Sequence, residues 1–124
     1  MSLRISSTEW KIMELVWEAP KTLMELVNAL TKSESWAKST IITMVRRLEA
    51  KQMLRYEQNG RTKTFFATVK RDDAVAEQTE SLLHRAYNSS LGSLVNTMVE
   101  RNNLTQQDID ELYAILQRAQ EALK

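Results

Sequence analysis

Three amphipathic segments in the first half of the chain predict three helices. The first follows the capping box Ser6-Ser7-Thr8-Glu9 and ends before Pro20. The second is expected at about 22–31, after another capping box that starts at Thr22, and the third at 38–51. The apolar positions that recur at helical spacing are Trp10, Met13, Val16 and Trp17, then Leu23, Leu26, Val27 and Leu30, then Ile41, Met44, Val45 and Leu48.

A change of period after Met53 predicts a β-hairpin. Leu54 and Tyr56 alternate with charged neighbours, and a second run covers 62–69. Asn59-Gly60 lies between the two runs and is typical of a tight hairpin turn. Three helices followed by a hairpin are typical of the winged helix-turn-helix arrangement, in which the third helix enters the major groove of DNA.

The rest of the chain is predicted to be helical. Apolar residues return to helical spacing after Lys70, and Thr105 caps a final helix. Because charge and period both change near residue 71, we expect two domains, a winged-helix DNA-binding domain at 1–70 and a helical region at 71–124. The fold class is therefore mainly α with a small β-hairpin wing. The C-terminal apolar stripes contain Leu91, Leu94, Val95 and Met98, then Ile109, Leu112, Tyr113 and Leu116.

The formal net charge of +1 conceals a strong asymmetry along the chain. Residues 1–70 hold twelve Lys and Arg against seven Asp and Glu, which gives +5. Residues 71–124 hold five basic and nine acidic residues, which gives −4. A basic first half and an acidic second half indicate a polyanionic partner for the first half only.

Composition excludes several functional classes. No stretch reaches the roughly 20 apolar residues that span a bilayer, and no apolar signal-peptide region is present, so we expect a cytoplasmic protein without membrane insertion. The chain has no Cys and a single His, His84, and therefore lacks thiol chemistry and a His-rich metal site. No phosphate-binding loop or Ser/His/Asp set appears. We expect no enzyme activity, no metal and no cofactor.

The polar side of the segment 38–51 carries groups that suit DNA. Hydroxyl groups can reach phosphates or base edges, and guanidinium groups suit phosphate or guanine. Ile42 on this side could pack on a thymine methyl group, although a single exposed apolar residue needs no function. Trp36, just before the segment, could approach a phosphate, but packing against the core is the favoured role. The candidate DNA-binding residues are Trp36, Lys38, Ser39, Thr40, Ile42, Thr43, Arg46, Arg47, Arg61 and Lys63.

Several stretches of the chain match a known pattern. These are ISSTEWKIMELVW at 5–17, WAKSTIITMVRRL at 36–48, Gly60-Arg61, YNSSL at 87–91 and LTQQDIDEL at 104–112. Together they resemble the penicillinase-repressor family, and most of all its BlaI/MecI branch, over about 5–116. The resemblance covers both halves of the chain, so it is more specific than a likeness to winged helices in general.

The resemblance implies a homodimer that represses genes by binding palindromic promoter DNA. The dimer core would contain Leu91, Leu94, Val95, Met98, Ile109, Leu112, Tyr113 and Leu116. Members of this branch repress β-lactam-resistance genes and are inactivated by cleavage through a membrane sensor-protease pathway. The Asn-Phe bond that is cleaved in them aligns with Thr97-Met98 here, and the Cys motif of copper-responsive members is missing.

Two other functions are compatible with the same residues. One is a ligand-gated winged-helix regulator, which would need a pocket between the two halves. The other is a protein-interaction module whose acidic C-terminal helices bind a helical partner. The excess of positive charge in the first half argues against the second.

Overall fold

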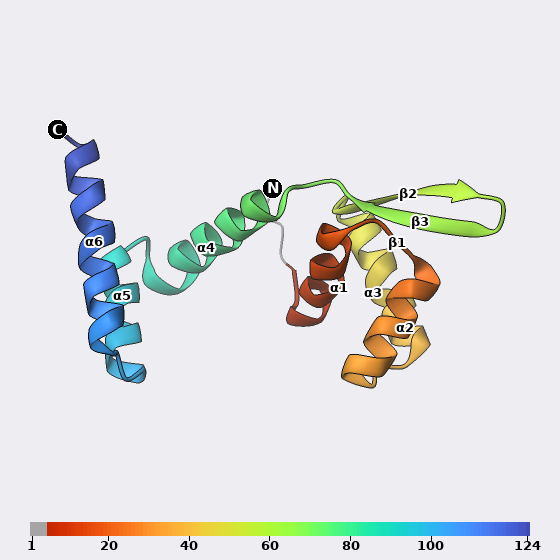
Figure 1. The fold of residues 1–124 in the computed structure, drawn as a ribbon, viewed down its shortest axis with the longest axis horizontal. Helices are drawn as coiled ribbons and strands as arrows, with labels where there is room; N and C mark the ends of the chain where they lie inside the picture. Colours follow the sequence, from red (N-terminus) through yellow and green to blue (C-terminus); the bar gives the residue numbers. More distant parts are fainter. Residues whose placement is uncertain (1–4) are drawn as a thin grey trace. The chain divides into compact units, whose positions relative to one another are not determined.

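The computed structural model describes residues 5–124, in which six helices and three short strands follow one another along the chain (Figure 1). Arg4, which belongs to the basic half of the sequence, and the start Met1-Ser2-Leu3 lie outside the described residues. The elements are α1 (Ser7–Glu18), β1 (Lys21–Thr22), α2 (Leu23–Glu34), α3 (Lys38–Ala50), β2 (Leu54–Asn59), β3 (Thr62–Ala67), α4 (Arg71–Tyr87), α5 (Leu91–Arg101) and α6 (Gln106–Ala122). The predicted order of three helices and a hairpin is confirmed.

Side-chain caps explain where the first two helices begin. Ser6 accepts a hydrogen bond from the backbone of Glu9, and the Glu9 carboxylate accepts one from the backbone of Ser6, which completes the predicted capping box of α1. Thr22 and Glu25 form the same box at α2. The second helix ends at Glu34, three residues beyond the expected end, because polar residues can continue a helix on its exposed side.

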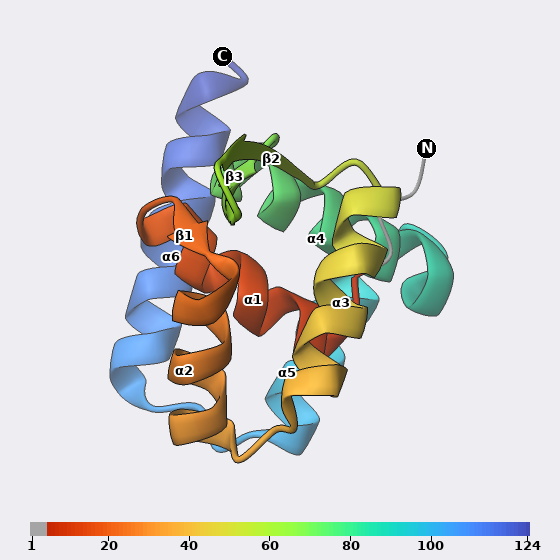
Figure 2. The same ribbon diagram turned by 90° about the vertical axis from the view of Figure 1, so that its right-hand side faces the viewer.

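The core of the first unit lies between the three helices and the sheet. Figure 1 and Figure 2 show α1, α2 and α3 gathered beside the strands. The largest fully buried side chains are Phe65, Ile12, Met13, Leu26, Ile41, Leu48 and Met53. Every helix of the first three therefore contributes its predicted apolar stripe to one common core.

The sheet has three strands in the order β1-β3-β2, all antiparallel, whereas the sequence predicted two. β1 is two residues long, too short to produce an alternating pattern. In the hairpin Asn59 pairs with Thr62, so the two turn residues are Gly60 and Arg61. Gly60 has a φ of 65° and occupies the first turn position, where a positive φ favours glycine.

The compact units divide between Ser81 and Leu82, inside α4, and not at residue 71 where helical periodicity resumes. The first turns of α4 pack on the winged helix because Ala74 is 1% exposed and belongs to its core. Arg71 of α4 also forms an ion pair with Glu14 of α1 at 2.9 Å. In the part of the chain that the structure describes, no helix has the length and apolar character needed to cross a membrane.

One buried charge links the start of α1 to the end of α3. Glu9 is 3% exposed, and its two carboxylate oxygens accept hydrogen bonds from Nζ of Lys51 at 2.8 and 2.9 Å. Burial raises the pKa of Glu9, but the hydrogen bonds from Lys51 and Ser6 outweigh it and leave the pKa below its ordinary value. Glu9 is therefore a charged core residue whose ion pair holds two helices together.

We predict that Lys51→Met lowers the free energy of unfolding by about 1–3 kcal/mol at neutral pH, because it leaves the Glu9 carboxylate buried without its cation. Chemical denaturation measures this loss. Arg55→Met is the matched control, since the Arg55–Glu57 pair is exposed and contributes about 0–1 kcal/mol. Equal losses in the two variants would contradict the role assigned to Glu9.

The lowered pKa of Glu9 also predicts an acid dependence. A group with a depressed folded-state pKa stabilises the protein above its unfolded pKa, about 4.3, and this stabilisation disappears as pH falls through the folded-state value. Glu9→Gln should therefore flatten the acid limb of the curve of stability against pH. An unchanged acid limb would show that another group controls it.

Candidate DNA-binding interface

The buried stripe of α3 determines which of its faces meets solvent. Ile41, Val45 and Leu48 are fully or almost fully buried in the core. Because a helix repeats every 3.6 residues, this stripe directs the opposite face outward. The ion pair between Glu9 and Lys51, the C-cap residue of α3, adds a second point of attachment at the end of the helix.

The outward face carries the hydroxyl and guanidinium groups that the sequence indicated. The exposed residues of α3 include Lys38, Ser39, Thr40, Thr43, Arg46 and Arg47. Ile42 is only partly exposed, but it does not belong to the core cluster. The structure thus brings together, on one helix, the set of groups expected to read a base edge and to hold phosphates.

Thr43 has a defined hydrogen-bonding capacity in this arrangement. Its hydroxyl donates to the backbone carbonyl of Ser39 at 2.9 Å, so its proton is engaged within the helix. The lone pairs of its oxygen stay available to accept from the amino group of adenine or cytosine. Thr43 is therefore equipped as an acceptor for a base edge.

The cations of this face lack carboxylate partners. Within residues 5–124, Lys38, Arg46 and Arg47 have no carboxylate at ion-pairing distance, nor do Arg61 and Lys63 of the hairpin. Other basic residues near the interface do form ion pairs: Lys51 with Glu9, and Arg55 with Glu57. The five candidate DNA-binding cations thus keep their positive charge without a carboxylate partner within the described residues.

Trp36 stands just before α3 and packs against the core while remaining partly exposed. Its carbonyl accepts a hydrogen bond from the Thr31 hydroxyl at 3.2 Å, and Nζ of Lys11 lies 5.9 Å from its ring. Trp36 therefore closes the turn between α2 and α3. The first turn of α3 has no side-chain cap, because Ala37 is its N-cap residue.

The hairpin carries the remaining two candidates away from the core. Arg61 lies in the turn at its tip, and Lys63 lies in β3 with its Nζ 4.3 Å from the centre of the Tyr56 ring. That cation–π contact orients the lysine without neutralising its charge. Together with α3, the hairpin provides a second set of cations on the winged helix.

A comparison with known protein families identifies the class of protein to which this winged helix belongs. Residues 5–118 match the model of the penicillinase repressor family. The chain belongs to that family. It is therefore a winged-helix DNA-binding transcriptional repressor, and not an enzyme.

Individual relatives agree with this membership. The penicillinase repressor of Bacillus licheniformis is 31% identical over 115 residues, which is 92% of this chain and 90% of the relative. The methicillin resistance regulatory protein MecI of Staphylococcus aureus is 25% identical over 92% of this chain and 94% of its own length. A solution structure of monomeric Bacillus licheniformis BlaI in complex with the blaP half-operator has a TM-score of 0.51 and 27% identity, covering 59% of this chain and 90% of that one.

Residues near the wing of this repressor escaped the sequence analysis. Thr22, Leu23 and Met24 at the start of α2 line a cavity of about 480 Å³ together with Arg61, Thr62 and Lys63 of the hairpin. β1 makes this neighbourhood possible because Lys21 and Thr22 pair with Phe65 and Thr64. Nothing local in 21–24 signals it, since the contact joins distant parts of the sequence.

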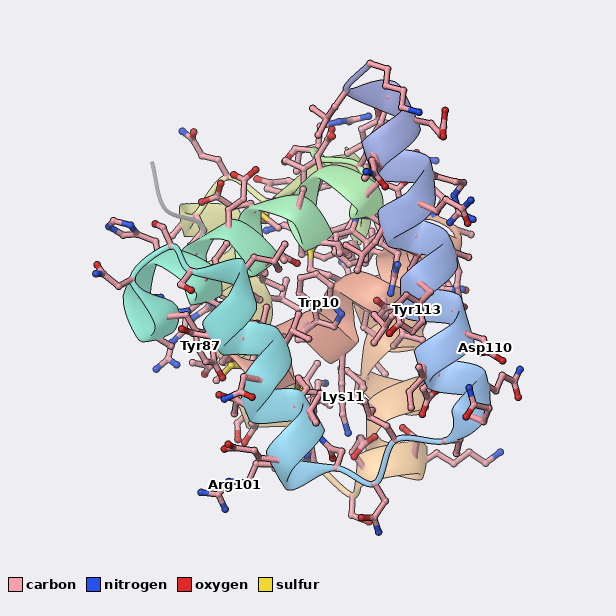
Figure 3. The ribbon with its side chains drawn as sticks, turned by 90° about the vertical axis from the view of Figure 1, so that its left-hand side faces the viewer. Trp10, Lys11, Tyr87, Arg101, Asp110 and Tyr113 are labelled. Carbon is pink, nitrogen blue, oxygen red and sulfur yellow. The ribbon has the colours of Figure 1, made fainter. Side chains whose placement is uncertain are left out.

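The second unit of the repressor leaves its apolar residues uncovered. α5 and α6 diverge from the short turn that joins them (Figure 3), and neither contains a buried residue among those described. Figure 3 labels Tyr113 on α6, which is 70% exposed, and Arg101 at the end of α5. A groove of about 610 Å³ is lined by Leu94, Val95, Met98, Val99, Asn102, Leu104, Asp108, Glu111, Leu112 and Ile115.

Four of the eight predicted dimerisation residues, Leu94, Val95, Met98 and Leu112, line that groove. Leu91, Tyr113 and Leu116 are exposed outside its lining, and Ile109 is partly buried. Val99, Leu104 and Ile115 also line it and were missed, because they lie beside the stripes that the sequence indicated. Thr97 and Met98, the expected cleavage pair, lie within α5.

We predict different effects for two substitutions on α3. Arg47→Ala should weaken binding to every DNA sequence by about threefold to tenfold and reduce the salt slope by about one unit, because it removes one phosphate contact. Thr43→Ala should mainly reduce discrimination at one base pair, by about 1–3 kcal/mol. Binding titrations at several salt concentrations, with matched and mismatched duplexes, separate the two effects.

Arg71→Ala provides the control for loss of a positive charge, because Arg71 pairs with Glu14 of α1 at 2.9 Å and is not a candidate DNA-binding residue. Its salt slope should stay close to that of the unchanged protein. Equal and sequence-independent losses for Arg47→Ala and Thr43→Ala would contradict the assignment of these residues.

Proposed function

We propose that this repressor binds a palindromic promoter operator as a homodimer, with α3 of each protomer in the major groove and each wing on the flanking backbone. The observation that carries the proposal is the outward face of α3, where Arg46 and Arg47 have no carboxylate partner among the described residues. Buried charges are normally paired, but exposed cations kept apart from carboxylates are typical of a phosphate-binding surface. The structure of BlaI in complex with the blaP half-operator supports the same use in this chain.

Base reading is assigned to Ser39, Thr40, Ile42 and Thr43. The three hydroxyl residues are exposed, and Ile42 is partly exposed beside them. Short hydroxyl side chains and a methyl-bearing side chain suit adenine, cytosine and the thymine methyl group. Lys38, Arg46 and Arg47 then hold phosphates beside the groove, and Arg61 and Lys63 hold phosphates at the wing.

A second copy of the chain is the proposed partner that buries the apolar groove of the second unit. A groove lined by Leu94, Val95, Met98, Leu112 and Ile115 would stay in contact with water in a monomer. Exposed apolar patches of this kind typically mark an interaction surface. Dimerisation also has a functional reason, because linking two half-site contacts raises the effective concentration of the second.

The proposal extends to the genes that the repressor regulates and to how repression is relieved. The relatives are named for penicillinase and for methicillin resistance, which supports β-lactam-resistance genes as targets. Induction through a membrane sensor-protease pathway would act on the bond between Thr97 and Met98. The Thr97 hydroxyl donates to the Ser93 carbonyl at 3.0 Å inside α5, so cleavage there requires local unfolding of that helix.

Selection of bound sequences from a random duplex library tests the proposed function. We expect enrichment of a palindrome with half-sites about one helical turn apart, and an affinity that falls steeply with salt. If no sequence is enriched and no duplex binds at low salt, the proposal fails. The second unit would then be tested as a module for a helical protein partner.

Dimerisation has its own prediction. Leu112→Lys should shift the protein to monomer, because it places a charge in the apolar groove, and should weaken operator binding by about tenfold or more. Sedimentation velocity and titration with the selected duplex measure the two effects. Gln117→Lys adds the same charge at an exposed polar position of α6 and should change neither. A dimer that withstands Leu112→Lys would show that the groove is not the dimer contact.

A further inference from the structure

The wing tip contains an asparagine whose surroundings favour a spontaneous reaction. Asn59 is the last residue of β2 and is exposed, and within residues 5–124 its side-chain amide has no hydrogen-bond partner. In the same described region the Gly60 N–H has no acceptor. A Cβ built on Gly60 would meet nothing within 4 Å. The Asn59 amide and the Gly60 nitrogen are therefore both free and in contact with water.

We propose that Asn59 is a site of spontaneous deamidation that weakens the contact of the wing with DNA. The Gly60 nitrogen loses its proton and attacks Cγ of Asn59, and ammonia leaves, which gives a five-membered succinimide. Water then adds to one of the two carbonyls and opens the ring to aspartate or isoaspartate. The net change is uptake of one water and release of one ammonia, with no oxidant or reductant.

Other asparagines are protected from the same reaction by the fold. Asn28 and Asn96 lie inside α2 and α5, where the following backbone N–H groups are engaged in helical hydrogen bonds. Asn88 precedes a serine in a turn, but the Ser89 N–H donates to the Leu83 carbonyl at 3.0 Å. In each case the attacking nitrogen is already engaged.

The remaining two asparagines lie between α5 and α6. Asn102 is held by a hydrogen bond from its Nδ2 to the Met98 carbonyl at 3.3 Å. Asn103 precedes Leu104, whose partly buried side chain hinders approach of the backbone nitrogen to the asparagine side chain. Asn59 should therefore react first.

The consequence for DNA binding rests on the proposed function. Deamidation adds one negative charge in the residue next to the turn that holds Arg61, and close to Lys63. The strand pair Asn59–Thr62 closes the two-residue turn. Isoaspartate inserts an extra methylene into the backbone at this pair and so disturbs the strand register beside the turn. Both changes weaken the proposed contact of the wing with phosphate. The added negative charge repels the phosphate, and the inserted methylene displaces the tip of the hairpin.

The chemical part is tested by incubating the full-length protein under mildly acidic and mildly alkaline conditions, followed by peptide mapping and enzymatic methylation of isoaspartate. We expect conversion at Asn59 before any other asparagine, and faster conversion at higher pH because the attacking nitrogen must lose its proton. Conversion that begins at Asn88 or Asn103 while Asn59 keeps its amide would overturn the proposal. This result needs no DNA, so it stays readable if the proposed function fails.

The functional part compares proteins aged in the same way. Aged protein should bind the selected duplex about threefold to tenfold more weakly than fresh protein, with a shallower salt slope, and fresh Asn59→Asp should reproduce the charge effect. Asn59→Ser cannot form the succinimide and should keep its affinity through ageing. Equal losses in the aged unchanged protein and in aged Asn59→Ser would overturn the link between deamidation and binding.

Discussion

The attachment of α3 to the core is the constraint on which the proposed DNA-binding surface depends. Ile41, Val45 and Leu48 are buried on one side of the helix, so the helix cannot rotate without exposing them. The ion pair from Lys51 to the buried Glu9 holds its last turn against the start of α1. The proposed reading of base edges by α3 needs this rigidity, because a small rotation of the helix would move its hydroxyl groups away from the base edges that they are proposed to contact.

The ion pairs of the first unit engage other basic residues and leave two arginines of α3 without a carboxylate partner among the described residues. Lys51, Arg55 and Arg71 pair with carboxylates within the first unit, whereas Arg46 and Arg47 are without such partners in the described chain. Binding DNA with an already paired arginine would require that pair to break first. Unpaired cations avoid this loss and release counterions on binding, which is a main source of affinity for DNA.

Much of the fold could be predicted because its signals are local. The capping residues Ser6 and Thr22, the stripe of α3 and the change of period near Leu54 are all contained in short windows, and each led to an element that the structure contains. The outward face of α3 followed from the same helical period. Its base-reading and phosphate roles stay predictions, because they depend on contacts with DNA that the fold alone does not fix.

The features that the sequence did not predict depend on contacts between distant residues. The sequence shows Lys51 only as one of the basic residues of the first half, because its partner Glu9 lies 42 residues earlier. β1 is visible only through its pairing with β3, and the start of α4 belongs with the winged helix only because Ala74 reaches that core.

The most direct test of the central claim is to measure nuclear Overhauser effects between the protein and its selected operator duplex. If α3 reads the major groove, the methyl groups of Thr40, Ile42 and Thr43 will show contacts to thymine methyl groups or to base protons of that groove. If these methyl groups show no contact to DNA while the bound complex gives contacts from another face, α3 is not the reading helix and the proposed mode of DNA binding is wrong.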